Sequence, residues 1–316
     1  MPHAADARWH VHTDTLGAAL TTHDLATLTV DDTFLAEAQR LLDVHGVLHL
    51  ASSTPVTLGA LTALAHHLGH PHQLPEPAPR ALPGSTFVRD LSAAARVDTS
   101  ASPPPYIETL HYDSAGPRPA AYSVLHTREV PATIAPQVWI DMAAVHAALP
   151  DTLRSLVTAR WAVHGALPAP TAPLDHAPPF DPRTNSRRPL TAEHWRTGKP
   201  VLYLPKHPHS TIEGLPDDEG RAVLADLWAR TAASPSRLAT TMRSNDVVVW
   251  DNLRVVHTNP PYPRERDRTV WFFVIPGDHR LKPAPETAAS DPSDEPGKST
   301  TPGGPAAGAL VGSADS

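Results

Sequence analysis

The chain has 316 residues, enough for one large domain or two smaller ones, and its apolar fraction of 41% is sufficient to bury a core. A formal net charge of −7 gives no electrostatic support for nucleic-acid binding, and the lack of cysteine excludes disulfides, thiolate metal sites and cysteine nucleophiles. The N-terminal residues show no basic patch followed by an apolar run, and no segment approaches the roughly 18 consecutive apolar residues of a membrane span. We therefore expect a globular, cytoplasmic protein without a membrane or nucleic-acid partner.

The first third of the chain predicts two helices and one strand. Residues 33–46 carry apolar side chains at helical spacing and end at a glycine, after which "VLHL" at 47–50 is typical of a buried strand. Residues 57–69 repeat the helical spacing and again end at a glycine, which places His66 and His67 on the surface or at the end of that helix. Residues 70–105 are rich in proline and are predicted to be irregular.

The rest of the chain is dominated by short strands. They are predicted at 121–130, 137–142, 200–204, 246–252 and 269–275, with helices at 142–157 and 217–232. Strands without strict alternation with helices favour an α+β protein with a mainly β core, a sandwich or barrel decorated by helices, over a doubly wound sheet. We assign residues 1–280 to one domain and residues 281–316, which offer almost nothing to bury, to a disordered tail.

The stretch "TLHYDSAG" at 109–116 contains a candidate metal-binding pair. On a strand, His111 and Asp113 would lie on one face and Tyr112 on the other, so that two ligand atoms could reach one ion. The chain has 20 histidines, so chance His-x-Asp pairs are expected, and we discount the pair at His12 because no strand pattern surrounds it. The best third ligand is His257, at the end of the apolar run "VVVWDNLRVVH". Two histidines and one carboxylate leave three positions open, as a non-haem Fe(II) centre requires.

Several motifs around these residues carry a family resemblance. "LHYD", "SVLHTREVP", "VWIDMAAVHAALP", "GKPVLYLP", "NDVVVWDNLRVVH" and "RDRTVWFF" occur in this order. Over roughly residues 15 to 276 the chain resembles the taurine dioxygenase (TauD/TfdA) family of Fe(II)- and 2-oxoglutarate-dependent oxygenases. The resemblance implies a double-stranded β-helix, or jelly roll, packed by helices. It also implies Fe(II), the co-substrate 2-oxoglutarate and O2.

Residue by residue, the resemblance assigns iron to His111, Asp113 and His257. It assigns the distal carboxylate of 2-oxoglutarate to Arg268, because a guanidinium can bind a carboxylate through two parallel hydrogen bonds. It gives Asn252 the role of orienting the turn before His257.

Two positions depart from the family pattern. Gln137 stands where the family has a threonine that helps to hold the co-substrate, and Phe272 stands where a second arginine is common. The missing contact could come from Arg266, from a loop register that pairs Arg264 with Arg268, or from iron and backbone alone.

The resemblance implies hydroxylation of a small molecule with release of succinate and CO2. The composition is typical of a bacterial genome of high GC content, where such enzymes often serve secondary metabolism. The alternatives are a desaturase or cyclase of the same family, a metal hydrolase, and a non-catalytic jelly-roll protein that binds a metal or ligand. Tyr106, Tyr122, His207 and His209 are candidate pocket residues, and a homo-oligomer stays open.

Overall fold

The structure, a computed structural model, groups the chain into two compact units, Met1–Pro285 and Glu286–Ser316. All of the described residues belong to the first unit: 9–12, 16–22, 24–25, 31–74, 81–91, 110–115, 118–131, 135–158, 160–164, 186–205, 210–258, 268–277 and 281–285. Across these ranges, none of the helices has both the length and the apolar character that crossing a membrane would require.

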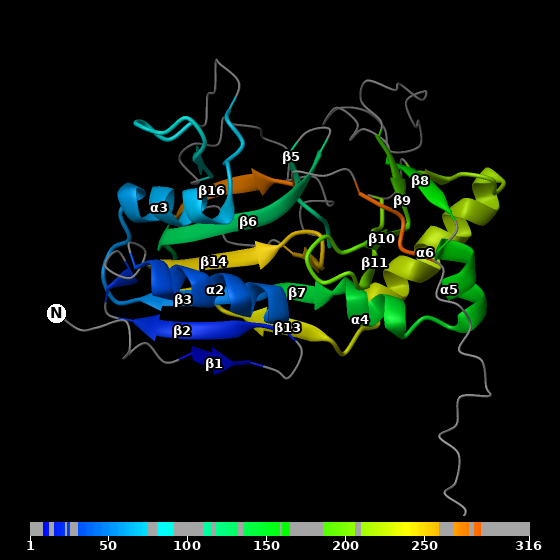
Figure 1. The fold of residues 1–316 in the computed structure, drawn as a ribbon, viewed down its shortest axis with the longest axis horizontal. Coiled ribbons are helices and arrows are strands. Elements are labelled where there is room, and N and C mark those ends of the chain that lie inside the picture. Colours follow the sequence, from blue (N-terminus) through cyan, green and yellow to red (C-terminus); the bar gives the residue numbers. More distant parts are fainter. Residues whose placement is uncertain are drawn as a thin grey trace, which may run out of the picture. The chain divides into compact units, whose positions relative to one another are not determined.

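One large sheet forms the main scaffold of this unit (Figure 1). Its strands follow the order β1 (Trp9–Val11), β2 (Ala18–Thr22), β3 (Val47–Ser52), β14 (Asp246–Asp251), β6 (Arg118–Glu129), β16 (Thr269–Pro276) and β4 (Arg89–Asp90), while β5 (Ser114–Ala115) pairs with β6. The pairs are antiparallel except for β2 with β3. Segments that are far apart in the sequence, such as β14 and β6, therefore lie side by side.

Three smaller sheets complete the β-structure. One contains β13 (Arg237–Thr240), β7 (Gln137–Asp141) and β15 (Val255–His257), another contains β12 (Thr211–Ile212), β8 (Trp161–His164) and β9 (Ser186–Pro189), and β10 (Thr191–Glu193) pairs with β11 (Pro200–Leu202). The short β14–β15 turn links the large sheet to the β13–β7–β15 sheet.

Both faces of the large sheet are buried at its central strand β14, in which every residue is buried. Val247 and Val249 belong to the apolar cluster that includes residues of α2 and α3. Val248 and Trp250 belong to a second cluster, which they share with Trp139 and Val255 of the β13–β7–β15 sheet. Successive strand residues point to opposite faces, so a continuous apolar run fills two cores. We call the second cluster the inter-sheet core.

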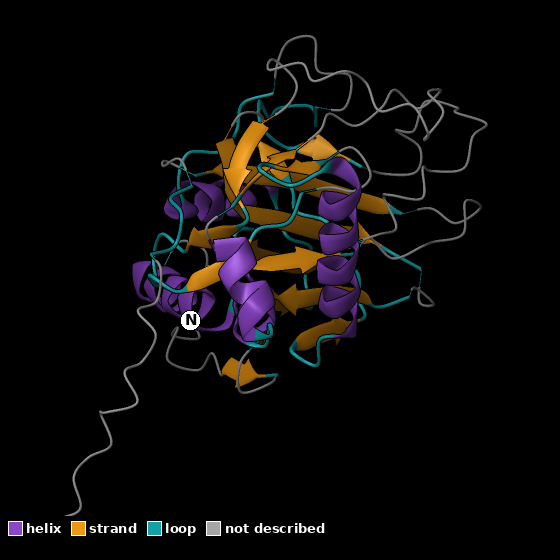
Figure 2. Ribbon diagram, turned by 90° about the vertical axis from the view of Figure 1, so that its right-hand side faces the viewer, coloured by secondary structure: helices purple, strands orange, loops and turns teal. Residues whose placement is uncertain are grey.

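The helices are α2 (Asp32–His45), α3 (Leu58–Leu68), α4 (Met142–Ala147), α5 (Asp151–Thr158) and α6 (Asp217–Ala233). Figure 1 shows α2 and α3 lying along one face of the large sheet, and α4, α5 and α6 gathered near β8–β12; Figure 2 shows the same layers turned by 90°. Helix α2 begins after Asp31, whose Oδ1 accepts the N–H groups of Thr33 and Phe34, and ends at Gly46 with a φ of +68°. The Gly46 carbonyl accepts the N–H of Asp251 (2.8 Å), which ties the end of α2 to the β14–β15 turn.

Most of the predicted elements are confirmed, with two corrections to their extent. The single helix expected at 142–157 is wrong: α4 ends at Ala147 and α5 begins at Asp151, since Pro150 lacks the N–H that a continuous helix needs. The start of the expected tail is also ordered, because Lys282 and Ala284 exchange backbone hydrogen bonds with β10 and Ala284 is buried. The rest of that tail, from 286 onward, lies outside the described residues.

Candidate metal centre

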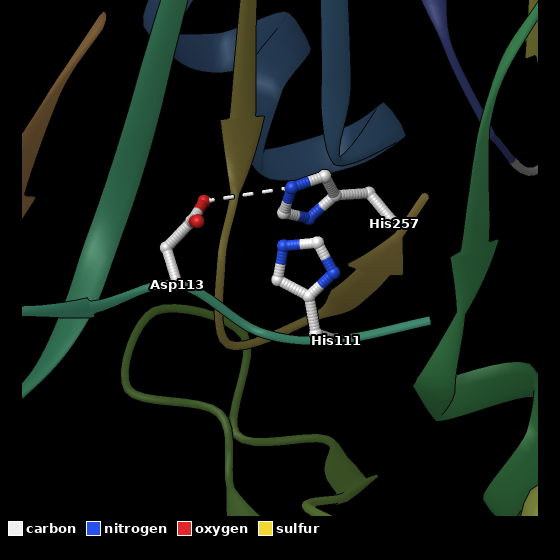
Figure 3. A group of neighbouring side chains, drawn as sticks. All are labelled: His111, Asp113 and His257. Carbon is white, nitrogen blue, oxygen red and sulfur yellow. Dashed lines mark ion pairs between the residues drawn. The ribbon is translucent and has the colours of Figure 1, made fainter. Parts of the chain in front are cut away.

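The structure brings His111, Asp113 and His257 together (Figure 3). One ligand atom from each lies within 4.8 Å of the others, and Nε2 of His257 is 3.8 Å from Oδ2 of Asp113. The two imidazole rings are 4.3 Å apart between centroids. Within the ranges that the structure describes, no other group of three or more His, Asp or Glu side chains meets the same condition. Two imidazoles and one carboxylate are a donor set that suits Fe(II), so the residues present fit the metal that the sequence predicts.

A backbone pairing holds the two histidines beside each other. The N–H of His111 donates to the carbonyl of His257, and the N–H of His257 donates to the carbonyl of His111, each at 3.0 Å. The prediction of a regular strand here is only partly right, because this is an isolated bridge and strand β5 starts at Ser114. The expected alternation holds nevertheless. Tyr112 points away, stacks on Tyr203 at 4.4 Å, and donates to the Leu202 carbonyl (2.5 Å); burial raises the pKa of Tyr112 well above its usual value.

Asn252 holds the backbone of Asp113 with both ends of its amide. Its Oδ1 accepts the N–H of Asp113 (2.8 Å), while its Nδ2 donates to the carbonyls of Asp113 (2.8 Å) and Ala120 (3.3 Å). The Asn252 side chain is fully buried, so these bonds meet no competition from water. The sequence predicts that Asn252 orients the turn before His257. Its side-chain hydrogen bonds hold the backbone of a different metal-ligand candidate, Asp113.

Sequence reasoning missed two side chains that support the triad. The Ser123 hydroxyl donates to Oδ2 of Asp113 (2.7 Å). Arg254, in the β14–β15 turn, donates to Asp141 Oδ2 from Nε (3.1 Å) and Nη2 (2.7 Å), and to the Val44 carbonyl (2.7 Å). The only signal in the sequence was the alternation of β6, which puts Ser123 on the face opposite Tyr122; nothing in the sequence identified Arg254.

Gln137 is the first residue of β7 and Arg268 directly precedes β16, and both of these strands border the inter-sheet core. Gln137 is buried and stands two residues before Trp139, whose Cα is paired with that of His257. Arg268 precedes β16, two residues before Val270 of the inter-sheet core, and its Nε atom is buried. Val274 of β16 is paired with Ser123, which contacts Asp113, so this end of β16 lies nearest the triad. Phe272 is two residues from Val274 and Arg268 is six, so Arg268 lies farther from the triad.

Of the remaining sequence candidates, the structure describes only Phe272 and Tyr122. Phe272 packs against Trp250, with ring centroids 6.2 Å apart, so its position contributes apolar surface. Tyr122, proposed for the pocket, belongs instead to the core under α2, where its hydroxyl accepts a hydrogen bond from Gln39 (3.0 Å); that prediction is wrong. Arg264, Arg266, Tyr106, His207 and His209 lie outside the described residues.

Comparison with known families places this geometry in context. The family model described as "Taurine catabolism dioxygenase TauD, TfdA family" matches residues 11–274. The chain belongs to this family. The match covers the β13–β7–β15 sheet and most of the large sheet, and it contains all of the residues discussed above from His111 to Arg268.

Individual relatives are similar at a lower level. The chain is 30% identical over 189 residues to "(S)-phenoxypropionate/alpha-ketoglutarate-dioxygenase" of Delftia acidovorans, covering 57% of this chain and 63% of that protein. It is 32% identical over 162 residues to "Alpha-ketoglutarate-dependent 2,4-dichlorophenoxyacetate dioxygenase" of Cupriavidus pinatubonensis, covering 48% of this chain and 54% of that protein. These matches thus span less than two thirds of either relative. A crystal structure of a taurine dioxygenase from Burkholderia xenovorans shares the fold, with a TM-score of 0.71, 22% identity, and coverage of 89% of this chain and 95% of that one.

Proposed function

We propose that this protein is an Fe(II)- and 2-oxoglutarate-dependent dioxygenase that hydroxylates a small-molecule substrate. The observation that carries the proposal is the convergence of His111, Asp113 and His257 from two distant parts of the chain into one group. Two relatives are named as α-ketoglutarate-dependent dioxygenases, which supports 2-oxoglutarate as the co-substrate. The large sheet and the β13–β7–β15 sheet, with the triad between them, are the arrangement expected of a double-stranded β-helix, and we propose that architecture for residues 1–280.

The chain's own residues would hold and orient the reactants. His111, Asp113 and His257 would bind the metal through one face and leave the opposite face open to ligands. The Ser123 hydroxyl and the Asn252 amide fix the carboxylate and backbone of Asp113, which limits the rotation of that ligand. Fe(II), with 2-oxoglutarate and O2, would supply the oxidation: one oxygen atom enters succinate as CO2 leaves, and the other enters the substrate.

Arg268 would bind the distal carboxylate of 2-oxoglutarate. Its place directly before β16, farther from the triad than Phe272, suits the far end of a five-carbon diacid whose other end would lie at the metal. Gln137, from the opposite sheet, can donate from its amide where the family has a threonine hydroxyl. Trp139, Trp250 and Phe272 surround this region with apolar rings, and they would exclude bulk water from the reacting groups.

Spectroscopy and product analysis test the proposal. Adding Fe(II) and 2-oxoglutarate to the protein without oxygen should give the visible metal-to-ligand charge-transfer band of a chelated 2-oxo acid. In air, succinate release should then rise with a suitable substrate, in a panel that includes 2-phenoxypropionate and 2,4-dichlorophenoxyacetate because relatives are named for them. Mass spectra of the products separate hydroxylation from desaturation or ring closure. Confirmed Fe(II) binding with no charge-transfer band would contradict the assignment of 2-oxoglutarate.

A further inference from the structure

A buried histidine–aspartate pair lies next to the β14–β15 turn. Nε2 of His194 is 2.7 Å from Oδ2 of Asp251, and each side chain is 1% exposed. His194 directly follows β10, and Asp251 is the last residue of β14. The family resemblance assigned no role to His194.

We propose that His194 is a positioning residue for the metal centre and that it acts through Asp251. The β10–β11 hairpin would thereby set the conformation of the turn from Asp251 to Arg254, on which the geometry of the metal ligands depends. This inference rests on the proposed metal centre. It adds a side chain from a separate sheet, the β10–β11 hairpin, that helps to position the metal ligands.

The hydrogen bonds around His194 define its tautomer. The backbone N–H of Thr197 donates to Nδ1 of His194 (3.2 Å), so Nδ1 carries no proton. The Thr197 hydroxyl accepts the N–H of Lys199 (3.4 Å) and lies 3.0 Å from the same Nδ1, to which it donates. The proton of a neutral His194 ring is therefore on Nε2 and points at Asp251. A fixed tautomer makes His194 a donor to Asp251 without requiring a charged ring.

Asp251 passes this constraint to both sides of the triad. Its Oδ1 accepts the N–H groups of Leu253 (3.0 Å) and Arg254 (3.1 Å), which closes the turn, and its Oδ2 takes the bond from His194. The next residue, Asn252, holds the backbone of Asp113 by two hydrogen bonds. The chain then enters β15 and reaches His257. A rotation of the Asp251 carboxylate would therefore displace both Asp113 and His257.

The hairpin is itself fixed against the scaffold, as a positioning element must be. Arg196, two residues after His194, forms an ion pair with Asp43 of α2 at 2.5 Å. Trp195 packs edge-on against Tyr122 of β6, with ring centroids 5.9 Å apart. The end of the same helix contacts the turn from the other side, through the carbonyl of Gly46. The position of His194 is thus determined by the large sheet and by α2.

Two substitutions at His194 separate this role from a purely local one. In His194→Gln, the amide nitrogen can occupy the place of Nε2 and donate to Asp251, while the acceptor for Thr197 is lost. In His194→Asn, the side chain retains an acceptor near Thr197 and cannot reach Asp251. If His194 only closed its own hairpin, His194→Asn would be the milder change. If it positions the metal centre, His194→Gln is the milder change.

The experiment measures Co(II) binding to the full-length apo-protein by calorimetry and by the visible absorption of the bound ion, together with the melting temperature. We expect His194→Asn to weaken Co(II) binding about 10- to 100-fold and to alter the Co(II) absorption, as is typical when a group that orients a metal ligand is removed. His194→Gln should stay within about threefold of the wild type, a difference of at most about 0.7 kcal/mol in binding free energy. Leu227→Ala, in the buried core of α6, serves as the control for lost stability and should leave Co(II) affinity unchanged.

The outcomes separate this inference from the proposed function. If the wild type binds no Co(II), the metal centre itself fails. If the wild type binds Co(II) and both His194 variants bind it equally well, the positioning role is wrong. A loss of affinity in Leu227→Ala equal to that in His194→Asn would also overturn it, because reduced stability alone would then account for the effect.

Discussion

At the scale of single residues, burial distinguishes the members of the triad. His257 is 2% exposed and packs against Trp250 at 4.7 Å, His111 is 9% exposed, and the Asp113 side chain is 15% exposed. A buried imidazole is held in place by its neighbours, so little conformational freedom is left to lose when a metal binds.

Replacing either histidine of the triad should abolish metal binding. His111→Ala and His257→Ala each remove one of three ligands, and we expect no measurable Co(II) or Fe(II) binding by calorimetry and no turnover. His12→Ala, which changes an exposed histidine next to β1, is the control and should bind metal as the wild type does. A greater loss in His12→Ala than in His111→Ala would show that the metal binds at the His12–Asp14 pair.

Arg268→Ala should raise the apparent 2-oxoglutarate requirement strongly. Loss of a charge-assisted contact with two hydrogen bonds costs about 2–5 kcal/mol when the partner charge remains buried. Arg268→Lys should recover only part of this, because an ammonium keeps the charge and cannot form both parallel bonds. The measurement is turnover against 2-oxoglutarate concentration, with Arg264→Ala alongside. A larger defect in Arg264→Ala would favour the alternative loop register, and no change in any variant would place the carboxylate contact elsewhere.

His146 of α4 should make the fold sensitive to acid. Burial lowers the pKa of His146 from 6.5 to about 4, so the folded protein binds its proton less tightly than the unfolded chain does. The free energy of unfolding should therefore be unaffected by this group above pH 6.5 and decrease as the pH falls from 6.5 towards 4, by on the order of 1–3 kcal/mol. Urea titrations at several pH values of the wild type and His146→Gln test this. An equal slope between pH 6.5 and 4 in both proteins would refute it.

At the scale of elements, the β14–β15 turn forms hydrogen bonds with several of the elements that surround the triad. Its residues contact α2 through the Val44 and Gly46 carbonyls, the first turn of α4 through Asp141, and the β5–β6 region through Asn252. Asp141 is buried and also accepts the N–H groups of Ala143 and Ala144. This turn thus joins the large sheet and the β13–β7–β15 sheet to α2 and α4 beside the triad.

Asn252→Ala should damage stability and metal affinity together. The substitution leaves the backbone N–H and carbonyl of Asp113 without their partner at a buried position, which costs about 1–3 kcal/mol in the free energy of unfolding. Because Asp113 is then less well held, Co(II) affinity should fall at least tenfold. Thr231→Val is the control: it removes a buried hydroxyl that donates to the Leu227 carbonyl within α6, and it should leave Co(II) affinity unchanged. A wild-type Co(II) affinity in Asn252→Ala would exclude Asn252 from the support of the metal centre.

At the scale of the whole molecule, the C-terminal segment divides into a part that packs on the fold and a part that the sequence predicts to be disordered. Ala284 donates to the Thr191 carbonyl (3.1 Å) and Lys282 accepts from Glu193 (2.9 Å), so residues 281–285 extend the edge of the β10–β11 hairpin. The expected disorder from residue 286 onward rests on composition alone and stays a prediction.

Truncation tests this division. Removing residues 286–316 should leave the melting temperature and metal affinity unchanged. Removing residues 281–316 should lower the melting temperature by several degrees, because two backbone hydrogen bonds and the buried Ala284 side chain are lost. Equal melting temperatures for the two truncated proteins would show that residues 281–285 contribute nothing to stability.

The sequence by itself predicted α2, α3, α6, most of the longer strands and the residues of the triad. It joined α4 and α5 into one helix and missed the five-residue strand β2. Local patterns sufficed for α2, α3 and β14, because glycine stops, helical spacing and an unbroken apolar run act within a few residues of the chain. The triad could be predicted because residue type and spacing alone single out His111, Asp113 and His257. In the structure these three residues lie together. The short strands β8, β9, β12 and β13 were missed, since strands of two to four residues carry too few alternating positions to be recognised.

Only the tertiary structure decided what supports the triad. Ser123 beside Asp113, Asn252 holding the Asp113 backbone, and His194 donating to Asp251 join segments from different sheets. Each contact depends on strand register, because a shift by one residue would turn the side chain to the opposite face. Register is set by pairing among distant segments and by packing of the whole core. For that reason no local stretch of this sequence identifies Ser123 or His194 as a neighbour of the site, and the role predicted for Asn252 beside His257 did not include its contact with Asp113.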